Sequence, residues 1–198
     1  MMILYLHGFR SSPASAKARL LGEAFEKLGL AAAWVCPQLP ASPSEAIALC
    51  EQLIDQHQQR LGHDRLVVIG SSLGGFYATY LAETHRAPAA VLNPAVQASR
   101  DLLPHVGSHR SYHSDEAYEF MLSHIDELKQ LVIPHLANPS RYYLLACTGD
   151  EVLNWQEMVQ YYQGCHLNLV QGSDHSISDF PLYQGEVVAF VLKHYLTT

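Results

Sequence analysis

The six residues from Gly70 to Gly75 constrain the fold of this chain more than any other stretch, because of what flanks them. Residues 65–69 form a short apolar run rich in β-branched side chains, which is typical of a buried parallel strand. Residues 76–82 continue without glycine or proline, as expected of a helix. A strand, a Gly-x-Ser-x-Gly turn and a helix in this order predict a nucleophile elbow, a tight turn that presents a serine at the edge of a sheet.

The spacing of the glycines chooses between two adjacent serines. Ser72 has Gly70 and Gly74 two residues away on either side, whereas Ser71 would need glycines where Ile69 and Leu73 stand. Positions that flank so tight a turn have no room for a Cβ atom. Ser72 is therefore the candidate nucleophile.

Length and charge limit the classes of protein to consider. A chain of 198 residues fits one domain with a real core. The formal net charge of −7 disfavours nucleic acid and anionic membranes as main partners, because both need a cationic face. No apolar run approaches the length of a membrane span. Residues 2–6 lack a basic leader and end at His7-Gly8, so we predict a strand there and not a signal peptide.

The cysteines and histidines do not form a recognisable metal site. None of the four cysteines belongs to a C-x-x-C pair, and their apolar neighbours favour buried free thiols in a cytoplasmic protein over a disulfide framework or a metal cluster. His105, His109 and His113 are four apart and would share one face of a helix. However, Pro104, Gly107 and the serine-rich stretch 108–114 interrupt a helix there. We therefore favour hydrogen-bonded or solvated histidines, with no metal and no cofactor.

Strand-like and helix-like segments alternate along the chain. This alternation predicts an α/β fold with three layers, in which a mostly parallel sheet of about six strands is flanked by helices. The expected strands are residues 2–6, 32–36, 65–69, 89–92, 142–147 and 166–170. The expected helices are residues 16–27, 44–60, 73–85, roughly 155–163 and roughly 182–196.

One connection in this pattern is too long for a single crossover helix. It runs over residues 96–140. Within it, residues 114–131 have a helical pattern of their own, with apolar side chains at three- and four-residue steps. The segment is either a small cap over the active edge of the sheet or a two-helix detour. We favour a small cap inserted at 96–140 into a single domain that spans residues 1–198.

A serine nucleophile needs a base and a group that orients the base. In a parallel sheet such groups gather at the carboxyl ends of the strands. Asp150 follows the expected strand 142–147, and His175 follows the expected strand 166–170. The order Ser72, Asp150, His175 is the Ser…Asp…His order of α/β-hydrolases.

Other residues compete for these two roles. For the acid, Glu151 is the alternative, whereas Asp174 is too close to His175 in sequence to accept from its ring and is expected to support the loop. For the base, His166 stands at the wrong end of its strand. We therefore predict a catalytic triad of Ser72, Asp150 and His175.

An acyl-transfer site also needs two backbone donors for the oxyanion. One is the N–H of Leu73, which follows the nucleophile at the start of a helix. The other is expected in the loop after the first strand, where we choose the N–H of Phe9. His7 is expected to orient this loop without contacting substrate. Arg10 either meets a negatively charged part of the substrate or faces water.

Four motifs in order resemble the α/β-hydrolase superfamily: Leu6-His-Gly-Phe9, the elbow, Thr148-Gly-Asp-Glu-Val152 and Ser173-Asp-His-Ser-Ile177. Together with the segment from Ser11 to Ala18, they resemble the small bacterial esterases of the YqiA/YcfP type over essentially the whole chain. The resemblance implies a compact hydrolase without the first two strands of larger relatives. It also implies a small-molecule substrate, either a short-chain acyl ester or an acyl thioester.

The primary hypothesis is therefore a serine esterase that acts through an acyl-enzyme. An acyl-CoA thioesterase on the same fold is the nearest alternative, and it predicts a cationic patch near the mouth of the site, for which Arg10, Arg100 and Arg110 are the candidates. A binding protein on a hydrolase fold that no longer catalyses is the alternative from another class. A metal-dependent hydrolase built on the histidine-rich segment ranks below both.

Overall fold

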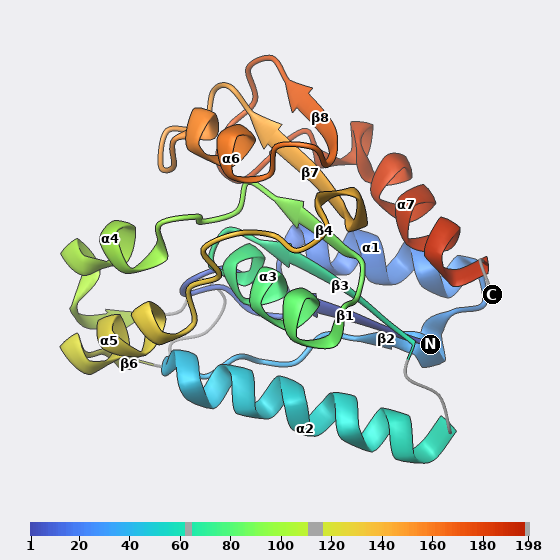
Figure 1. The fold of residues 1–198 in the computed structure, drawn as a ribbon, viewed down its shortest axis with the longest axis horizontal. Coiled ribbons are helices and arrows are strands. Elements are labelled where there is room, and N and C mark those ends of the chain that lie inside the picture. Colours follow the sequence, from blue (N-terminus) through green and yellow to red (C-terminus); the bar gives the residue numbers. More distant parts are fainter. Residues whose placement is uncertain (62–64, 111–116, 197–198) are drawn as a thin grey trace.

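A parallel β-sheet forms the centre of the protein (Figure 1). The computed structural model describes residues 1–61, 65–110 and 117–196. Within these residues, six strands form the sheet in the order β2-β1-β3-β4-β7-β8. In chain order they are β1 (Met2–Leu6), β2 (Trp34–Val35), β3 (Leu66–Ser71), β4 (Ala89–Leu92), β7 (Tyr142–Cys147) and β8 (His166–Val170). Each neighbouring pair is parallel, so the predicted fold class is confirmed.

Helices cover both faces of the sheet (Figure 1). The α-helices of the described residues are α1 (Ala16–Lys27), α2 (Pro43–Leu61), α3 (Leu73–His85), α4 (Ala98–Leu102), α5 (Leu122–Gln130), α6 (Trp155–Tyr161) and α7 (Gln184–Leu196). Short 3₁₀ turns lie at η1 (Ala31–Ala33), η2 (Leu103–His105), η3 (Pro139–Arg141) and η4 (Phe180–Leu182). All five predicted helices are present, with ends that differ by up to two residues from the expected ones.

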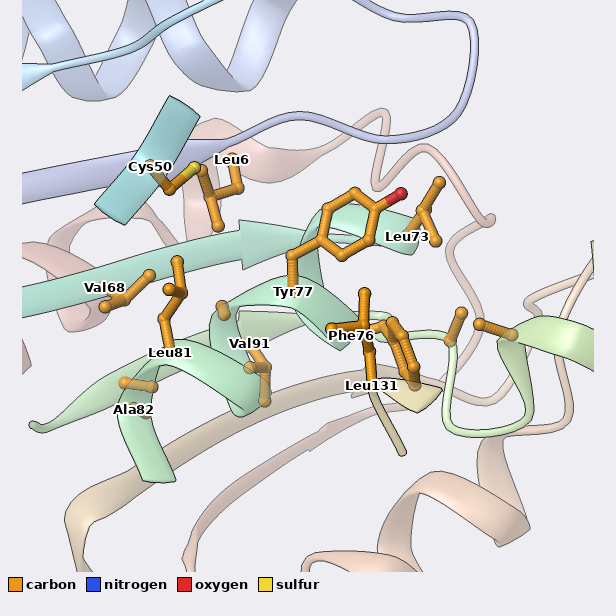
Figure 2. Close-up of a cluster of buried hydrophobic side chains, with 14 of the residues drawn as sticks. Leu6, Cys50, Val68, Leu73, Phe76, Tyr77, Leu81, Ala82, Val91 and Leu131 are labelled. Carbon is orange, nitrogen blue, oxygen red and sulfur yellow. The ribbon is translucent and has the colours of Figure 1, made fainter. Parts of the chain in front are cut away.

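The core consists of one apolar cluster on each face of the sheet, because successive strand side chains point to opposite faces. Side chains of α1 and α7 pack on one face, against Ile3, Tyr5 and Ile69. Side chains of α2, α3 and α6 pack on the other. Figure 2 shows this second cluster, with Leu81 of α3 beside Val68 of the sheet. Nine of the thirteen residues of α3 are buried, so the helix that follows the elbow is itself part of the core.

The connection between β4 and β7 differs from the helix expected over residues 114–131. It contains α4, an antiparallel hairpin of β5 (Gly107–Arg110) with β6 (Ala117–Phe120), and α5. The helical prediction is wrong over Ala117–Phe120, which pair with β5 as a strand, and it is correct from Leu122 to Gln130. The first part of that prediction, residues 114–116, lies outside the described residues.

Polar contacts tie this connection to the rest of the fold. The Glu127 carboxylate on α5 accepts hydrogen bonds from the Ser42 hydroxyl (2.8 Å) and the Ser44 N–H (3.0 Å) at the start of α2. Burial opposes ionisation of Glu127, but the hydrogen bonds from Ser44 and Ser42 outweigh it and lower the pKa of the carboxyl. On α4, the Arg100 guanidinium binds both carboxylate oxygens of Glu157 on α6. The segment is therefore attached at both of its helices, and its role as a cap stays a prediction.

Among the described residues, no helix combines the length and the apolar character that crossing a membrane requires.

Candidate functional site

Ser72 lies at the junction of β3 and α3, and its backbone has a geometry that residues other than glycine rarely adopt. Its φ and ψ are 56° and −123°, outside the favoured regions for a residue with a Cβ atom. The neighbouring glycines explain how the turn is accommodated. A Cβ atom on Gly74 would lie 2.0 Å from the carbonyl oxygen of Leu6, and one on Gly70 would lie 2.1 Å from that of Gly74. The turn therefore exists only with glycine at both positions, as the spacing predicted.

The structure brings Ser72, His175 and Asp150 together at the carboxyl edge of the sheet. His175 Nε2 lies 3.0 Å from Ser72 Oγ, and His175 Nδ1 lies 2.8 Å from Asp150 Oδ2. The Asp150 side chain is fully buried, whereas 17% of the His175 side chain is exposed. The other Asp150 oxygen accepts the N–H groups of Val152 (2.9 Å) and Leu153 (2.7 Å). Hydrogen bonds therefore hold the carboxylate with one oxygen directed at the imidazole.

The competing residues have other partners. Glu151 Oε2 accepts the backbone N–H of His175 at 2.9 Å, so it binds the loop and not the ring. Asp174 Oδ1 accepts the N–H of Ser178 at 2.9 Å, in agreement with the supporting role expected for it. His7 is buried, and its Nε2 accepts the N–H of Leu39 at 3.1 Å. Its proton is then on Nδ1, which donates to the carbonyl of Gly8 at 3.0 Å and so orients the loop after β1.

One predicted oxyanion donor follows the nucleophile in the chain, and the other follows a glycine that packs against the nucleophile. Leu73 is the first residue of α3, so its N–H has no acceptor within the helix and lies at the positive end of the helix dipole. Gly8 packs against Ser72: a Cβ atom on Gly8 would lie 3.1 Å from Ser72 Cβ and 3.6 Å from Oγ. Phe9 directly follows Gly8. The use of these two N–H groups as an oxyanion hole stays a prediction.

The β5–β6 hairpin packs on this same loop. The Phe9 ring contacts those of Phe120 and His109, with centroids 5.1 Å and 5.3 Å apart. Arg10 has a positive φ of 60°, and its Nε donates to the carbonyl of Arg110 at 2.8 Å. Arg10 therefore links the loop to the hairpin, and its contact with substrate stays a prediction.

The histidine-rich segment shows no metal-binding arrangement in the part of the chain that the structure describes, where no three His, Cys, Asp or Glu side chains are placed to hold an ion. His109 Nε2 instead binds the carbonyl of His105, and the two rings are 6.4 Å apart. His113 lies outside the described residues.

Two residues near His175 were not predicted from the sequence. Asn93 follows β4 and is fully buried, with its amide between the end of β7 and the His175 loop. Its position directly after a buried strand is the same signal that indicated Asp150. Lys17, in α1, donates from Nζ to the carbonyl of Ser176. Burial lowers the pKa of Lys17 to about 8, although Asp174, Cys147 and Asp150 act in the opposite direction.

Solved structures similar to this chain are α/β-hydrolases. Est1E from Butyrivibrio proteoclasticus, solved with ferulic acid bound, has a TM-score of 0.77 at 14% identity, and the match covers 99% of this chain and 90% of that one. Alpha/beta hydrolase domain-containing protein 10 from mouse has a TM-score of 0.73 at 16% identity, with coverage of 96% and 89%. The esterase Pf2001 from Pyrococcus furiosus has a TM-score of 0.68 at 13% identity, with coverage of 97% and 80%. At such identities the likeness establishes the fold alone.

The sequence also matches a family over almost its full length. Residues 2–192 match the family described as "Uncharacterised protein family (UPF0227)". This match confirms the expected relation to the YqiA/YcfP type of α/β-hydrolase. The protein therefore belongs to uncharacterised protein family UPF0227.

Proposed function

We propose that this protein is a serine esterase that hydrolyses short-chain carboxylic esters through an acyl-enzyme. The observation that carries the proposal is the chain of hydrogen bonds from Asp150 through His175 to Ser72, at 2.8 Å and 3.0 Å. A serine hydroxyl becomes nucleophilic when a base is placed to take its proton and a third group holds that base in the right tautomer. The three side chains have the chemistry and the spacing for these roles.

In the proposed reaction, Ser72 Oγ attacks the acyl carbonyl while its proton passes to His175 Nε2. Asp150 accepts the Nδ1 proton of His175 in a hydrogen bond and stabilises the imidazolium that forms. The N–H groups of Leu73 and Phe9 stabilise the negative oxygen of the tetrahedral intermediate. His175 then protonates the leaving alcohol. Water, activated by His175, hydrolyses the acyl-enzyme and restores the free serine.

An acyl-CoA thioesterase is the alternative on the same fold, and one contact weakens the case for it. The cationic patch that it predicts includes Arg100, but that guanidinium already binds Glu157 through two hydrogen bonds and Asp101 through another. The two neighbouring carboxylates cancel the positive potential of the guanidinium, so it attracts a nucleotide phosphate only weakly. Comparison of turnover on acyl-CoA with turnover on simple esters separates the two activities.

The first prediction is that Ser72→Ala abolishes hydrolysis and labelling. The protein is expected to hydrolyse a short-chain p-nitrophenyl ester and to react covalently with a fluorophosphonate, which mass spectrometry locates on Ser72. Ser72→Ala should reduce ester turnover by roughly 10⁴-fold or more and prevent labelling, because no other hydroxyl is hydrogen-bonded to His175 among the described residues.

Ser71→Ala is the matched control, since it removes the neighbouring hydroxyl from the end of β3 and leaves Ser72 and His175 in contact. It should still be labelled. Unchanged turnover in Ser72→Ala, or a wild-type protein that is folded but is not labelled, would overturn the esterase and favour a binding protein on this fold.

A further inference from the structure

The loop that carries His175 receives several of its backbone hydrogen bonds from distant side chains. It runs from the end of β8 to η4 and contains residues with positive φ at Ser173 (58°) and Ile177 (51°). Three consecutive carbonyls of this loop, those of residues 174, 175 and 176, each accept a hydrogen bond from a side chain outside it. The bonds to the carbonyls of Asp174 and His175 are partly buried, where such partners offset the loss of water, whereas the bond to the carbonyl of Ser176 lies at the surface. Within the loop, the N–H of Ile177 also donates to the carbonyl of Asp174. The position of His175 is therefore set in part by contacts that its own loop does not supply.

Asn93 binds the first two of these carbonyls. Its Nδ2 donates to the carbonyls of Asp174 and His175, both at 3.1 Å, and its Oδ1 accepts the N–H of Cys147 at 2.8 Å. Because both ends of the amide have obligatory partners, its orientation is determined. The Asn93 backbone N–H also donates to the carbonyl of Leu145. Asn93 thus joins the ends of β4 and β7 to the loop from the sheet side.

Lys17 binds the third carbonyl from the helix side. It lies in the first turn of α1, and Nζ donates to the carbonyl of Ser176, one residue beyond His175. The ammonium also interacts electrostatically with Asp174, Cys147 and Asp150. It belongs to the segment from Ser11 to Ala18, where Ser12 Oγ accepts the N–H of Ala14 and Ser15 is the N-cap residue of α1. That segment has no other assigned role.

We propose that Lys17 is a positioning residue, which holds the backbone beyond His175 so that the imidazole spans the distance between Asp150 and Ser72. The role of His175 as the base rests on the proposed function. A bond to an ammonium is about twice as strong as one between neutral groups. When this bond is lost, water replaces the ammonium at the exposed carbonyl of Ser176, and because water does not fix the position of that carbonyl the loop relaxes. A displacement of the base on the order of 1 Å costs up to about 10²-fold in rate.

The test compares Lys17→Met with Lys27→Met, which removes an exposed lysine from the last turn of the same helix. On a short-chain p-nitrophenyl ester, Lys17→Met is expected to lower kcat on the order of 10- to 100-fold, with KM changed less than twofold. Lys27→Met should match the wild type. Complete reaction with a fluorophosphonate counts the folded sites, so that kcat is expressed per competent site.

The pH profile distinguishes positioning from simple stabilisation. With a pKa of about 8, Lys17 loses its proton as pH rises through 8, and the charged hydrogen bond becomes a weaker neutral one. The kcat of the wild type should therefore fall on the alkaline side, and Lys17→Met should lack this fall. Among the groups that face Lys17, Asp174 and Asp150 are carboxyls, and burial raises the pKa of the Cys147 thiol above its ordinary value. Because burial moves the pKa of the Cys147 thiol further from 8, that thiol does not account for a loss of activity near pH 8.

A proton NMR measurement keeps the proposal separate from the esterase assignment. The Nδ1 proton of His175, hydrogen-bonded to Asp150, is identified as the downfield signal that disappears in Asp150→Asn. Lys17→Met should shift this signal and Lys27→Met should not, whether or not the wild type hydrolyses esters. A wild type without turnover but with the shift in Lys17→Met would overturn the esterase and support the positioning role. An unmoved signal, or a kcat per site and pH profile equal to those of the wild type, would overturn the role of Lys17.

Discussion

At the scale of single residues, the adjacent carboxylates Asp150 and Glu151 bind different parts of the same histidine. Asp150 accepts from the imidazole, whereas Glu151 accepts from the backbone N–H. The difference follows from the turn after β7, in which the N–H groups of Val152 and Leu153 hold the shorter side chain within hydrogen-bond distance of the ring Nδ1. The longer glutamate reaches the backbone instead. The two carboxylates therefore have separable effects on His175.

The second prediction belongs to the residue scale and concerns the substitution Asp150→Asn. The asparagine can donate its amide hydrogen to His175 Nδ1, which stabilises the tautomer with the proton on Nε2, where it cannot accept the proton of Ser72. We expect kcat to fall roughly 10⁴-fold, with KM little changed. Steady-state kinetics measures both constants.

Glu151→Gln is the matched comparison, because its amide oxygen still accepts the N–H of His175. The kcat of Glu151→Gln should fall by less than about tenfold, because Glu151 does not contact the imidazole that becomes charged in the reaction. A larger loss in Glu151→Gln than in Asp150→Asn would exchange the roles of the two residues.

At the scale of elements, the site depends on the close approach of β1, β3 and α3. The register pairs Leu6 with Gly70, so the loop after β1 begins beside the elbow. Gly74 in the first turn of α3 packs against the carbonyls of Leu6 and His7. Since backbone contacts backbone here, no flexible side chain can move to accommodate a larger residue. The same contact that places the nucleophile therefore also stabilises the fold.

The next prediction is that Gly74→Ala strongly destabilises the protein. The new methyl group would lie 2.0 Å from the Leu6 carbonyl oxygen, so α3 or β1 must move. We expect the free energy of unfolding to fall on the order of 3 kcal/mol, which urea denaturation measures. Gly185→Ala in the first turn of α7 is the control, because its Cβ meets no atom within 4 Å. It should stabilise the helix by about 0.5 kcal/mol. Equal stability of Gly74→Ala and the wild type would contradict the prediction and show that α3 and β1 can move apart without a cost in free energy.

At the scale of the whole molecule, the core clusters on the two faces of the sheet enclose the cysteines to different degrees. Cys50 and Cys147 are 1% and 0% exposed and belong to opposite faces, whereas Cys36 and Cys165 are partly buried. All four are free thiols. Burial raises the pKa of Cys36 and Cys50 to about 12. Because the thiolate is the reactive form, burial lowers both access and reactivity.

The last prediction uses these thiols to follow unfolding of the whole chain. In native protein at pH 8, a disulfide reagent that measures thiols should react with Cys50 and Cys147 only as fast as the molecule unfolds globally, because each thiol is buried in the core cluster of its own face. In guanidinium without reductant, four thiols should react per chain. A count of fewer than four would contradict the free state of the cysteines. Rapid reaction of Cys147 in native protein would show that the end of β7, where the Cys147 N–H binds Asn93, opens locally.

Much of the fold and the candidate site could be predicted because the information is local. The glycine spacing around Ser72 reports a turn that only glycine permits, and it needs no knowledge of distant residues. Likewise, polar residues after buried strands indicated Asp150 and His175, since the carboxyl ends of parallel strands meet at one edge of a sheet. The hairpin at β5 and β6 was missed because three- and four-residue apolar spacing in 114–131 favoured a helix, and strand pairing overrode it over Ala117–Phe120.

The sequence by itself determined the chain order of the six strands of the sheet, the elbow and the edge of the sheet where the polar groups gather. Only the tertiary structure excluded Glu151 as the partner of the imidazole, and only it placed Asn93 and Lys17 against the loop of His175. The physical reason is chain distance. Lys17 and Ser176 are 159 positions apart, and a hydrogen bond over that separation depends on how α1 and the sheet pack together. No local periodicity encodes that packing.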